Sequence, residues 1–243
     1  MIVNPIKEGW EIIYQQAHAL LAAELALHWR ADQRPLYWMA TLAAIAQHDD
    51  GQKDWRGKDG LTPAGAPADF TQVPFVLEQA TEVLHEARFQ GRWRTLLTSL
   101  HLSFLYEPLR GTDQSIDNLL DAQEPLQKAC RQSLQVHKKQ VQQAYALMQW
   151  CDRLSLILCR RELPEMERLL EISPGPDGTP YQVRQRQSGT VEVLPWPFET
   201  PSVTVTVEAS YLPQLQFKDD AALAEALRKA PIKTKTWELR GSP

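Results

Sequence analysis

The sequence predicts a mainly α-helical protein with a small β-rich C-terminal extension. Through the first two-thirds of the chain, apolar residues recur every three or four positions, which is the period of an amphipathic helix. After residue 175 they alternate every second position, which is typical of strands. A segment rich in proline and glycine, residues 173–178, separates the two patterns. We therefore expect an all-helical domain over residues 1–165 and an α+β extension over residues 175–243.

The helical part divides into segments separated by breaker residues. Trp10, Ile13 and Ala17 begin the first apolar stripe, and Pro35 suits the start of the second helix. We expect helices over residues 8–29, 36–47, 74–90, 92–106, 116–130 and 136–163. Residues 50–71 are rich in glycine, proline and aspartate and are predicted to form a long loop. Loops of this length in a compact domain are usually functional or disordered, so we expect the loop to border a site.

The extension is predicted to contain a hairpin, a long strand, a short helix and a last strand. In order, these cover residues 181–185 and 191–193, 203–209, 221–229 and 234–239. So few elements form a marginal domain, and we expect the extension to pack on the helical body. Trp196 and Phe198 lie between prolines. They either form a docking segment for a partner or tuck the extension against the helices, and we favour the second role.

Composition excludes several classes of protein. The formal net charge of −4, with no basic stripe, argues against a nucleic-acid-binding surface. The three cysteines, Cys130, Cys151 and Cys159, show no metal or redox spacing and are interpreted as reduced thiols. There is no signal-peptide pattern, and no apolar run approaches the roughly 18–20 residues of a membrane span. We expect a cytoplasmic protein with neither nucleic acid nor membrane as a partner, and an oligomer is left open.

Residues of the types that bind metals occur where a solvated surface would not place them. His48 and Asp49 close the helix predicted over residues 36–47, whereas His18 and Asp152 each lie within an apolar helical run. A buried carboxylate must be protonated, pair with a cation or bind a metal, so Asp152 is either a metal ligand or half of a structural ion pair. His18 alone could be a hydrogen-bonded core residue. Nitrogen and oxygen ligands without a thiolate suit Mn, Fe, Co, Ni or Zn.

The order His18, then His48 and Asp49, then Asp152 resembles the HD-domain superfamily of metal-dependent phosphohydrolases. The resemblance covers residues 9–160 and implies an HD-type helical bundle in which these residues hold a divalent transition metal. It also implies that Asp49 is catalytic, orienting and deprotonating a metal-activated water. The start of the chain and residues 47–51 and 194–198 look like a bacterial family catalogued only as a domain of unknown function.

Two more histidines fall between Asp49 and Asp152. With His85 and His101 added, the order resembles the six-ligand dinuclear centres of the superfamily, including its mixed-valence di-iron oxygenases. His85 and His101 are therefore candidates for a second metal or for substrate contact. A solvated helix edge is the alternative for His85, and an ordinary core position is the alternative for His101.

Three functions follow from this set of residues. The first is a phosphohydrolase acting on a nucleotide or another small anionic phosphoester, with Lys53, Arg56 and Lys58 of the long loop binding the substrate by charge-assisted hydrogen bonds. A solvated loop with balanced charges is the alternative for these three residues. The second function is a di-iron oxygenase on the same scaffold. The third is a non-catalytic binding or sensor module.

Overall fold

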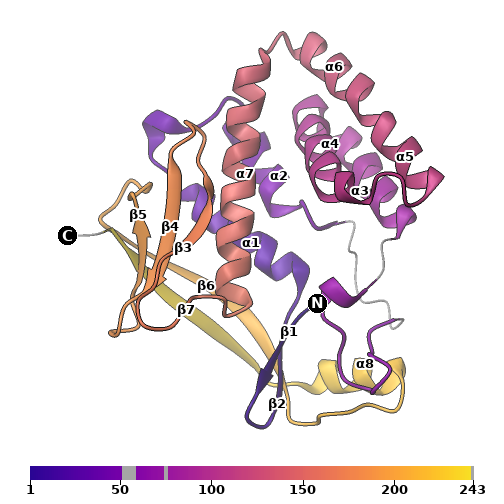
Figure 1. Cartoon of the computed structure of the whole chain (residues 1–243), viewed down its shortest axis with the longest axis vertical. Helices are drawn as coiled ribbons and strands as arrows, with labels where there is room; N and C mark the ends of the chain where they lie inside the picture. Colours follow the sequence, from indigo (N-terminus) through magenta and orange to yellow (C-terminus); the bar gives the residue numbers. More distant parts are fainter. Residues whose placement is uncertain (51–58, 74–75, 242–243) are drawn as a thin grey trace.

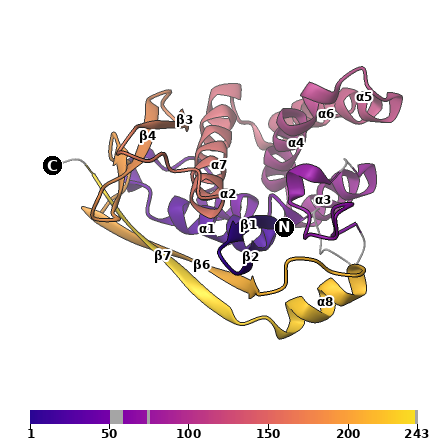
Figure 2. The same cartoon turned by 60° about the horizontal axis from the view of Figure 1, so that its bottom comes forward.

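The protein combines a curled sheet with a set of helices that lie against and beyond its inner face (Figures 1 and 2). The computed structural model describes residues 1–50, 59–73 and 76–241. The helices are α1 (Gln15–Leu27), α2 (Trp38–Ala46), α3 (Leu77–Gln90), α4 (Arg92–Tyr106), α5 (Gln114–Asp121), α6 (Gln123–Leu134), α7 (Lys138–Cys159) and α8 (Asp220–Lys229). The strands are β1 (Ile2–Ile6), β2 (Gly9–Ile13), β3 (Leu170–Pro174), β4 (Pro180–Gln185), β5 (Val191–Leu194), β6 (Ser202–Leu212) and β7 (Ile232–Arg240).

The described strands form one sheet that joins the two ends of the sequence. Its order is β1-β2-β6-β7-β5-β4-β3, and every neighbouring pair is antiparallel except β5 and β7, which are parallel. The connection between the ends is the pairing of β2 with β6, in which Trp10 lies opposite Leu212. The long ladder between β6 and β7 forms the middle of the sheet.

The predicted fold class, a mainly α HD-type bundle with a small β-rich extension, is wrong, and the chain is not all-helical. The sheet has seven strands in the described residues, and two of them, β1 and β2, come from the N-terminus. Pairing between strands separated by about two hundred residues leaves no local pattern in the sequence. The extension thus supplies most of a large sheet that the helices need in order to bury their apolar faces.

The helix predicted over residues 8–29 is also wrong in its first turns, because a strand and a helix share that stretch. Ile12 and Ile13 fit the apolar spacing of either element, so the pattern alone does not separate them. Gly9 distinguishes the two. Its φ of +125° is one that L side chains rarely adopt, and an added Cβ would overlap the carbonyl oxygen of Leu212. The chain therefore turns at Gly9, pairs β2 with β6, and begins α1 only at Gln15.

The helices α1 and α7 lie between the sheet and the group formed by α3, α4, α5 and α6, whereas α8 lies at the end of the sheet (Figures 1 and 2). In both views β3 and β4 lie on one side of α7, and α4 and α6 lie on the other (Figures 1 and 2). Alternate residues of β6, including Val203, Val205 and Val207, point into the core and are buried, whereas their neighbours are exposed. Phe198 is also buried, 2% exposed, so the segment before β6 is tucked against the helices. Among the described helices, none has the length and apolar character needed to cross a bilayer.

A buried carboxylate ties the N-terminal strands to the rest of the sheet. Glu11 of β2 is 1% exposed and accepts hydrogen bonds from Arg161 Nη2 at 2.6 Å, Lys235 Nζ at 2.7 Å and Tyr211 Oη at 2.9 Å. Asn4 of β1 adds a fourth bond at 3.1 Å. Burial opposes the charge, but the hydrogen bonds from Arg161 and Lys235 outweigh it and lower the pKa of Glu11 to about 2.

Replacing this carboxylate is expected to destabilise the protein near neutral pH. Glu11→Gln leaves Arg161 and Lys235 without their counter-charge, and we expect a loss of about 3 kcal/mol in the free energy of unfolding at pH 7. Because the pKa of Glu11 is lowered on folding from 4.5 to about 2, its stabilisation is complete above 4.5 and is lost as the pH falls towards 2. Urea unfolding curves for wild type and variant should therefore converge between pH 4.5 and pH 2. The exposed Glu8→Gln is the control, and equal stability of Glu11→Gln and wild type at pH 7 would contradict the prediction.

Candidate metal centre

Five of the predicted ligand residues meet in one buried cluster, which is called the metal centre below. It comprises His18 from α1, His48 and Asp49 from the end of α2, His101 from α4 and Asp152 from α7. The first four are between 1% and 7% exposed, and the side chain of Asp152 is 15% exposed. Three histidines and two carboxylates at such burial are too costly to leave unpaired. Their side chains must therefore compensate one another or a bound cation.

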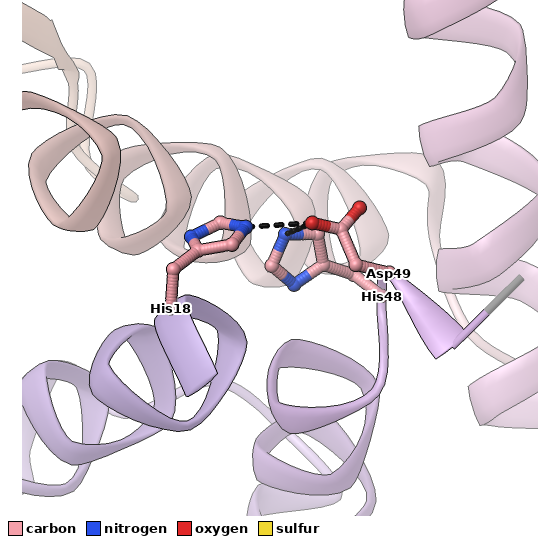
Figure 3. Close-up of side chains that lie close together, drawn as sticks. All are labelled: His18, His48 and Asp49. Carbon is pink, nitrogen blue, oxygen red and sulfur yellow. Dashed lines mark hydrogen bonds and ion pairs between the residues drawn. The ribbon is translucent and has the colours of Figure 1, made fainter. Parts of the chain in front are cut away.

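The metal centre contains two overlapping groups with the geometry of ligand sets. The nearest ligand atoms of His18, His48 and Asp49 lie within 4.8 Å of one another, and so do those of His48, His101 and Asp152. His48 is common to both groups. Figure 3 shows the rings of His18 and His48 directed at one oxygen of Asp49, while its other oxygen points away from both. The Nε2 atom of His48 lies 3.6 Å from Asp49 Oδ2 and 3.2 Å from Asp152 Oδ1.

The end of α2 aims His48 into the metal centre. The last helical residue is Ala46, and Gln47 has a φ of −122° and a ψ of 15°, outside the helical range. Carbonyl groups at a helix end have no partner within the helix. The ring of His48 folds back so that its Nδ1 lies 2.7 Å from the carbonyl oxygen of Ile45. His48 therefore caps its own helix through Nδ1 and turns Nε2 towards Asp49.

The contact of His48 with Ile45 fixes the protonation of the ring. A carbonyl oxygen can only accept, so Nδ1 of His48 carries the hydrogen of this bond. In a neutral ring Nε2 then holds only a lone pair. This atom faces the carboxylates of Asp49 and Asp152, yet it has no aligned hydrogen-bond partner in the described part of the chain, although Asp152 Oδ1 is only 3.2 Å away. A lone pair facing two anions is unfavourable unless a proton or a metal cation lies between them.

Ser155 likewise determines that Nδ1 of the His18 ring carries a hydrogen. The Ser155 hydroxyl donates to the carbonyl oxygen of Asp152 at 2.8 Å and so uses its single hydrogen. It must then accept the bond of 2.9 Å that it shares with His18 Nδ1, which therefore carries a hydrogen. The Nε2 atom of His18 lies 2.6 Å from Asp49 Oδ2. Both histidines thus direct Nε2 at Asp49 while their Nδ1 atoms are held by neutral oxygens, an arrangement common among metal-binding histidines.

Without a metal, the charges of the metal centre hold a proton on His48. Burial opposes that proton, but Asp49 and Asp152 outweigh burial and raise the pKa of His48 to about 10. Burial likewise opposes the ionisation of Asp49 and Asp152, and the charge of His48 outweighs it, so the pKa of each carboxyl lies below its ordinary value. For His101, burial and the charge of His48 act together and lower the pKa to about 4. His101 is therefore a neutral base at pH 7.

The other predicted site residues do not belong to the metal centre as described. His85 is exposed on α3, where its ring packs against Phe89 with centroids 5.0 Å apart. It has the position of a helix-edge residue. The three predicted substrate-binding residues, Lys53, Arg56 and Lys58, lie outside the described residues.

Sequence reasoning missed three polar neighbours of the metal centre. Gln15 donates to Asp49 Oδ2 at 3.4 Å, and Tyr145 Oη lies 3.4 Å from His101 Nδ1. Ser155 is the third. Helical spacing could have revealed two of them, because Gln15 precedes His18 by one turn and Ser155 follows Asp152 by one turn.

A small pocket between α3 and α4 reaches His48, Asp49 and His101. Its volume is about 20 Å³, which is room for about one water molecule. Gln79, Thr98 and Tyr106 supply the other polar groups in its lining. Burial, with the charge of Asp49, raises the pKa of Tyr106 to about 12, so its phenol is neutral at pH 7. Of two larger hollows that Arg88 lines, one lies on α3 and the other between α4 and α6, and no residue of the metal centre lines either.

The family comparison covers every residue of the metal centre. A family described as a protein of unknown function, DUF3891, matches residues 1–214, and the chain belongs to that family. The match runs from β1 to the end of β6, so it includes the N-terminal strands as well as the helices. No curated protein and no solved structure matches the chain. The family assigns no reaction, so the resemblance to the HD-domain superfamily stays a prediction.

The protonation of His48 can be tested in protein treated with a chelator. Because its pKa is raised from 6.5 to about 10, His48 should remain an imidazolium at pH 8.5. Its charge stabilises the metal-free fold fully below pH 6.5, and this stabilisation is lost as the pH rises through about 10. Long-range proton–nitrogen NMR spectra report the state of the ring, and His48→Gln identifies its signals. A neutral His48 at pH 8.5 in metal-free protein would refute the charge assignment.

Proposed function

We propose that the protein is a metal-dependent phosphohydrolase of small phosphoesters, with a divalent transition metal held by His18, His48, Asp49 and Asp152. The observation that carries the proposal is the Nε2 atom of His48. It is buried, lies 3.6 Å and 3.2 Å from two carboxylates, and makes no aligned hydrogen bond within the described residues. The residues fit a metal because histidine nitrogens and carboxylate oxygens suit Mn, Fe, Co, Ni and Zn.

The groups around the pocket are suited to the activation of water. When bound, such a metal lowers the pKa of coordinated water and offsets charge on a phosphoryl group. Asp49 is held through Oδ2 by His18 and Gln15, and its other oxygen points away from the histidine rings (Figure 3). That oxygen can orient the attacking water and accept its proton. Tyr106 lines the same pocket as a neutral phenol and can donate to an oxygen of the substrate.

The surroundings of the metal centre agree with a small anionic substrate in a reducing compartment. The pocket beside Asp49 and His101 has room for about one water molecule, which suits an attacking water. The three cysteines are free and buried, which fits the cytoplasm. The net charge of −4 gives no general attraction for nucleic acids or anionic membranes.

One observation favours a second candidate, a di-iron oxygenase. His48, His101 and Asp152 form a second ligand group, which shares His48 with the group of His18, His48 and Asp49. Because His48 offers only Nε2, a second metal beside the first would take His101 and Asp152 as its ligands. The exposed position of His85 counts against the six-ligand dinuclear arrangement that the sequence order resembles. For this reason the hydrolase is the first proposal.

Metal content is the first test. We expect wild-type protein, purified without chelators or an affinity tag, to contain about one equivalent of a transition metal by plasma mass spectrometry. Asp49→Ala should lose it, because one of the two carboxylates of the metal centre is removed. His85→Gln is the matched control and should keep the metal, since His85 lies outside the metal centre. Two equivalents of iron would favour the oxygenase, and no metal in any protein after addition of Mn, Fe or Ni would leave a binding or sensor module.

Hydrolysis is the second test. A panel of small phosphomonoesters and nucleotides, assayed with each metal, should reveal turnover that Asp49→Asn lowers at least about 100-fold in kcat/KM, because the general base and a ligand are lost together. His85→Gln should retain wild-type activity. Metal-loaded wild-type protein that hydrolyses none of the panel, or an Asp49→Asn variant as active as wild type, would count against the phosphohydrolase.

A further inference from the structure

A buried guanidinium lies beside the metal centre without touching it. Arg94 is on the first turn of α4 and is 2% exposed. Its hydrogen bonds within the described residues all go to neutral oxygens. Nη1 donates to the side-chain oxygens of Gln47 and, at 2.6 Å, of Gln90; Nη2 donates to the backbone carbonyl of Gln47 at 3.1 Å; and Nε donates to Thr98 Oγ1 at 3.3 Å. Burial of such a cation is costly and lowers the pKa of the guanidinium, and the charge of Asp50 offsets this cost only in part.

The main partner of Arg94 is the residue that ends α2. Gln47 is the C-cap of that helix, and the next two residues are His48 and Asp49. Arg94 holds Gln47 at two points, its backbone carbonyl and its side-chain oxygen. A cation at a helix C-terminus also interacts favourably with the helix dipole. A planar fork that binds two oxygens at once fixes orientation as well as distance, which a lysine cannot do.

The same arginine is linked to the histidine that α4 contributes. Arg94, Thr98 and His101 follow one another at four and three residues, so they lie along one face of α4. The ring of His101 faces that of His48, with centroids 5.2 Å apart. Any slip of α4 along α2 would separate these two rings. The hydrogen bonds from Arg94 to Gln47 oppose such a slip at the end of α2.

We infer that Arg94 is a positioning residue of the metal centre, which sets His48 and Asp49 against His101 by fixing the end of α2 to α4. It acts through Gln47 and does not itself bind the metal. The inference rests on the proposed metal centre and adds a residue that neither the ligand order nor the family match identifies. It explains why a buried cation is kept among neutral oxygens.

The test compares Arg94→Lys with Arg92→Lys, an exposed arginine on the same turn of α4. Affinity for Co²⁺ is measured by competition with a chelating dye, and the visible Co²⁺ absorption band reports the coordination geometry. We expect Arg94→Lys to bind Co²⁺ about 10- to 100-fold more weakly, with an altered band, because outer residues that orient ligands have effects of this size. Arg92→Lys should match wild type in both. The melting temperature of each metal-free protein is recorded, and all binding is measured well below it.

The outcomes separate this inference from the proposed metal centre. Wild type that binds no Co²⁺ overturns both. Wild type that binds, together with an Arg94→Lys variant of equal affinity and unchanged band, overturns the role of Arg94 alone, and so does a lowered melting temperature with unchanged affinity. If Arg94→Lys does not fold, Gln47→Leu removes one of the two held oxygens without burying a new charge. It should weaken Co²⁺ binding in the same direction by a smaller factor, and unchanged binding in that variant would also overturn the inference.

Discussion

The packing of α1 against α7 is the contact on which both halves of the molecule depend. Both helices bury small side chains, among them Ala19, Ala22 and Ala26 of α1 and Ala144 of α7. On one side this pair supports the sheet through β6 and β3, and on the other it supports α2 and α4. Because α1 carries His18 and α7 carries Asp152, the packing that builds the core also sets the spacing of the metal centre.

The apolar core and the metal centre are built on the same helices, the core from aromatic rings and the metal centre from charged and polar side chains. Where α1 and α7 meet the sheet, Trp29, Trp150, Tyr181 and Phe198 pack their rings edge to face, with the two indoles 4.9 Å apart. Such contacts place positive ring edges against negative ring faces. Asp152 follows Trp150 by only two residues but points at His48. The helix α7 thus carries its apolar anchor and its buried charge on nearly opposite faces, and the packing of the anchor limits how far Asp152 can move.

The candidate ligands left a local signal in the sequence, whereas the fold around them did not. His18, His48, Asp49 and Asp152 stood out because they lie in or at the end of apolar helical stretches. The sheet depends on pairs such as Trp10 with Leu212, which no local pattern reports. His85 and His101 fell in the same interval but in different contexts, and the structure places His85 at an exposed helix edge and buries His101. Arg94 gave no signal at all, since its burial results from the approach of α2 to α4.

Charge balance explains why a divalent cation suits the metal centre. Asp49 and Asp152 bring two negative charges, and His101 is held neutral by burial. The Nδ1 atoms of His18 and His48 are occupied by Ser155 and by the carbonyl of Ile45, so these two rings can meet a cation only through their Nε2 atoms. One divalent cation shared by these atoms would neutralise the two carboxylates. A monovalent ion with neutral rings leaves one buried negative charge, which the low polarity of the site makes unfavourable. The proton on His48 occupies the same space as such a cation, so binding a metal would release that proton.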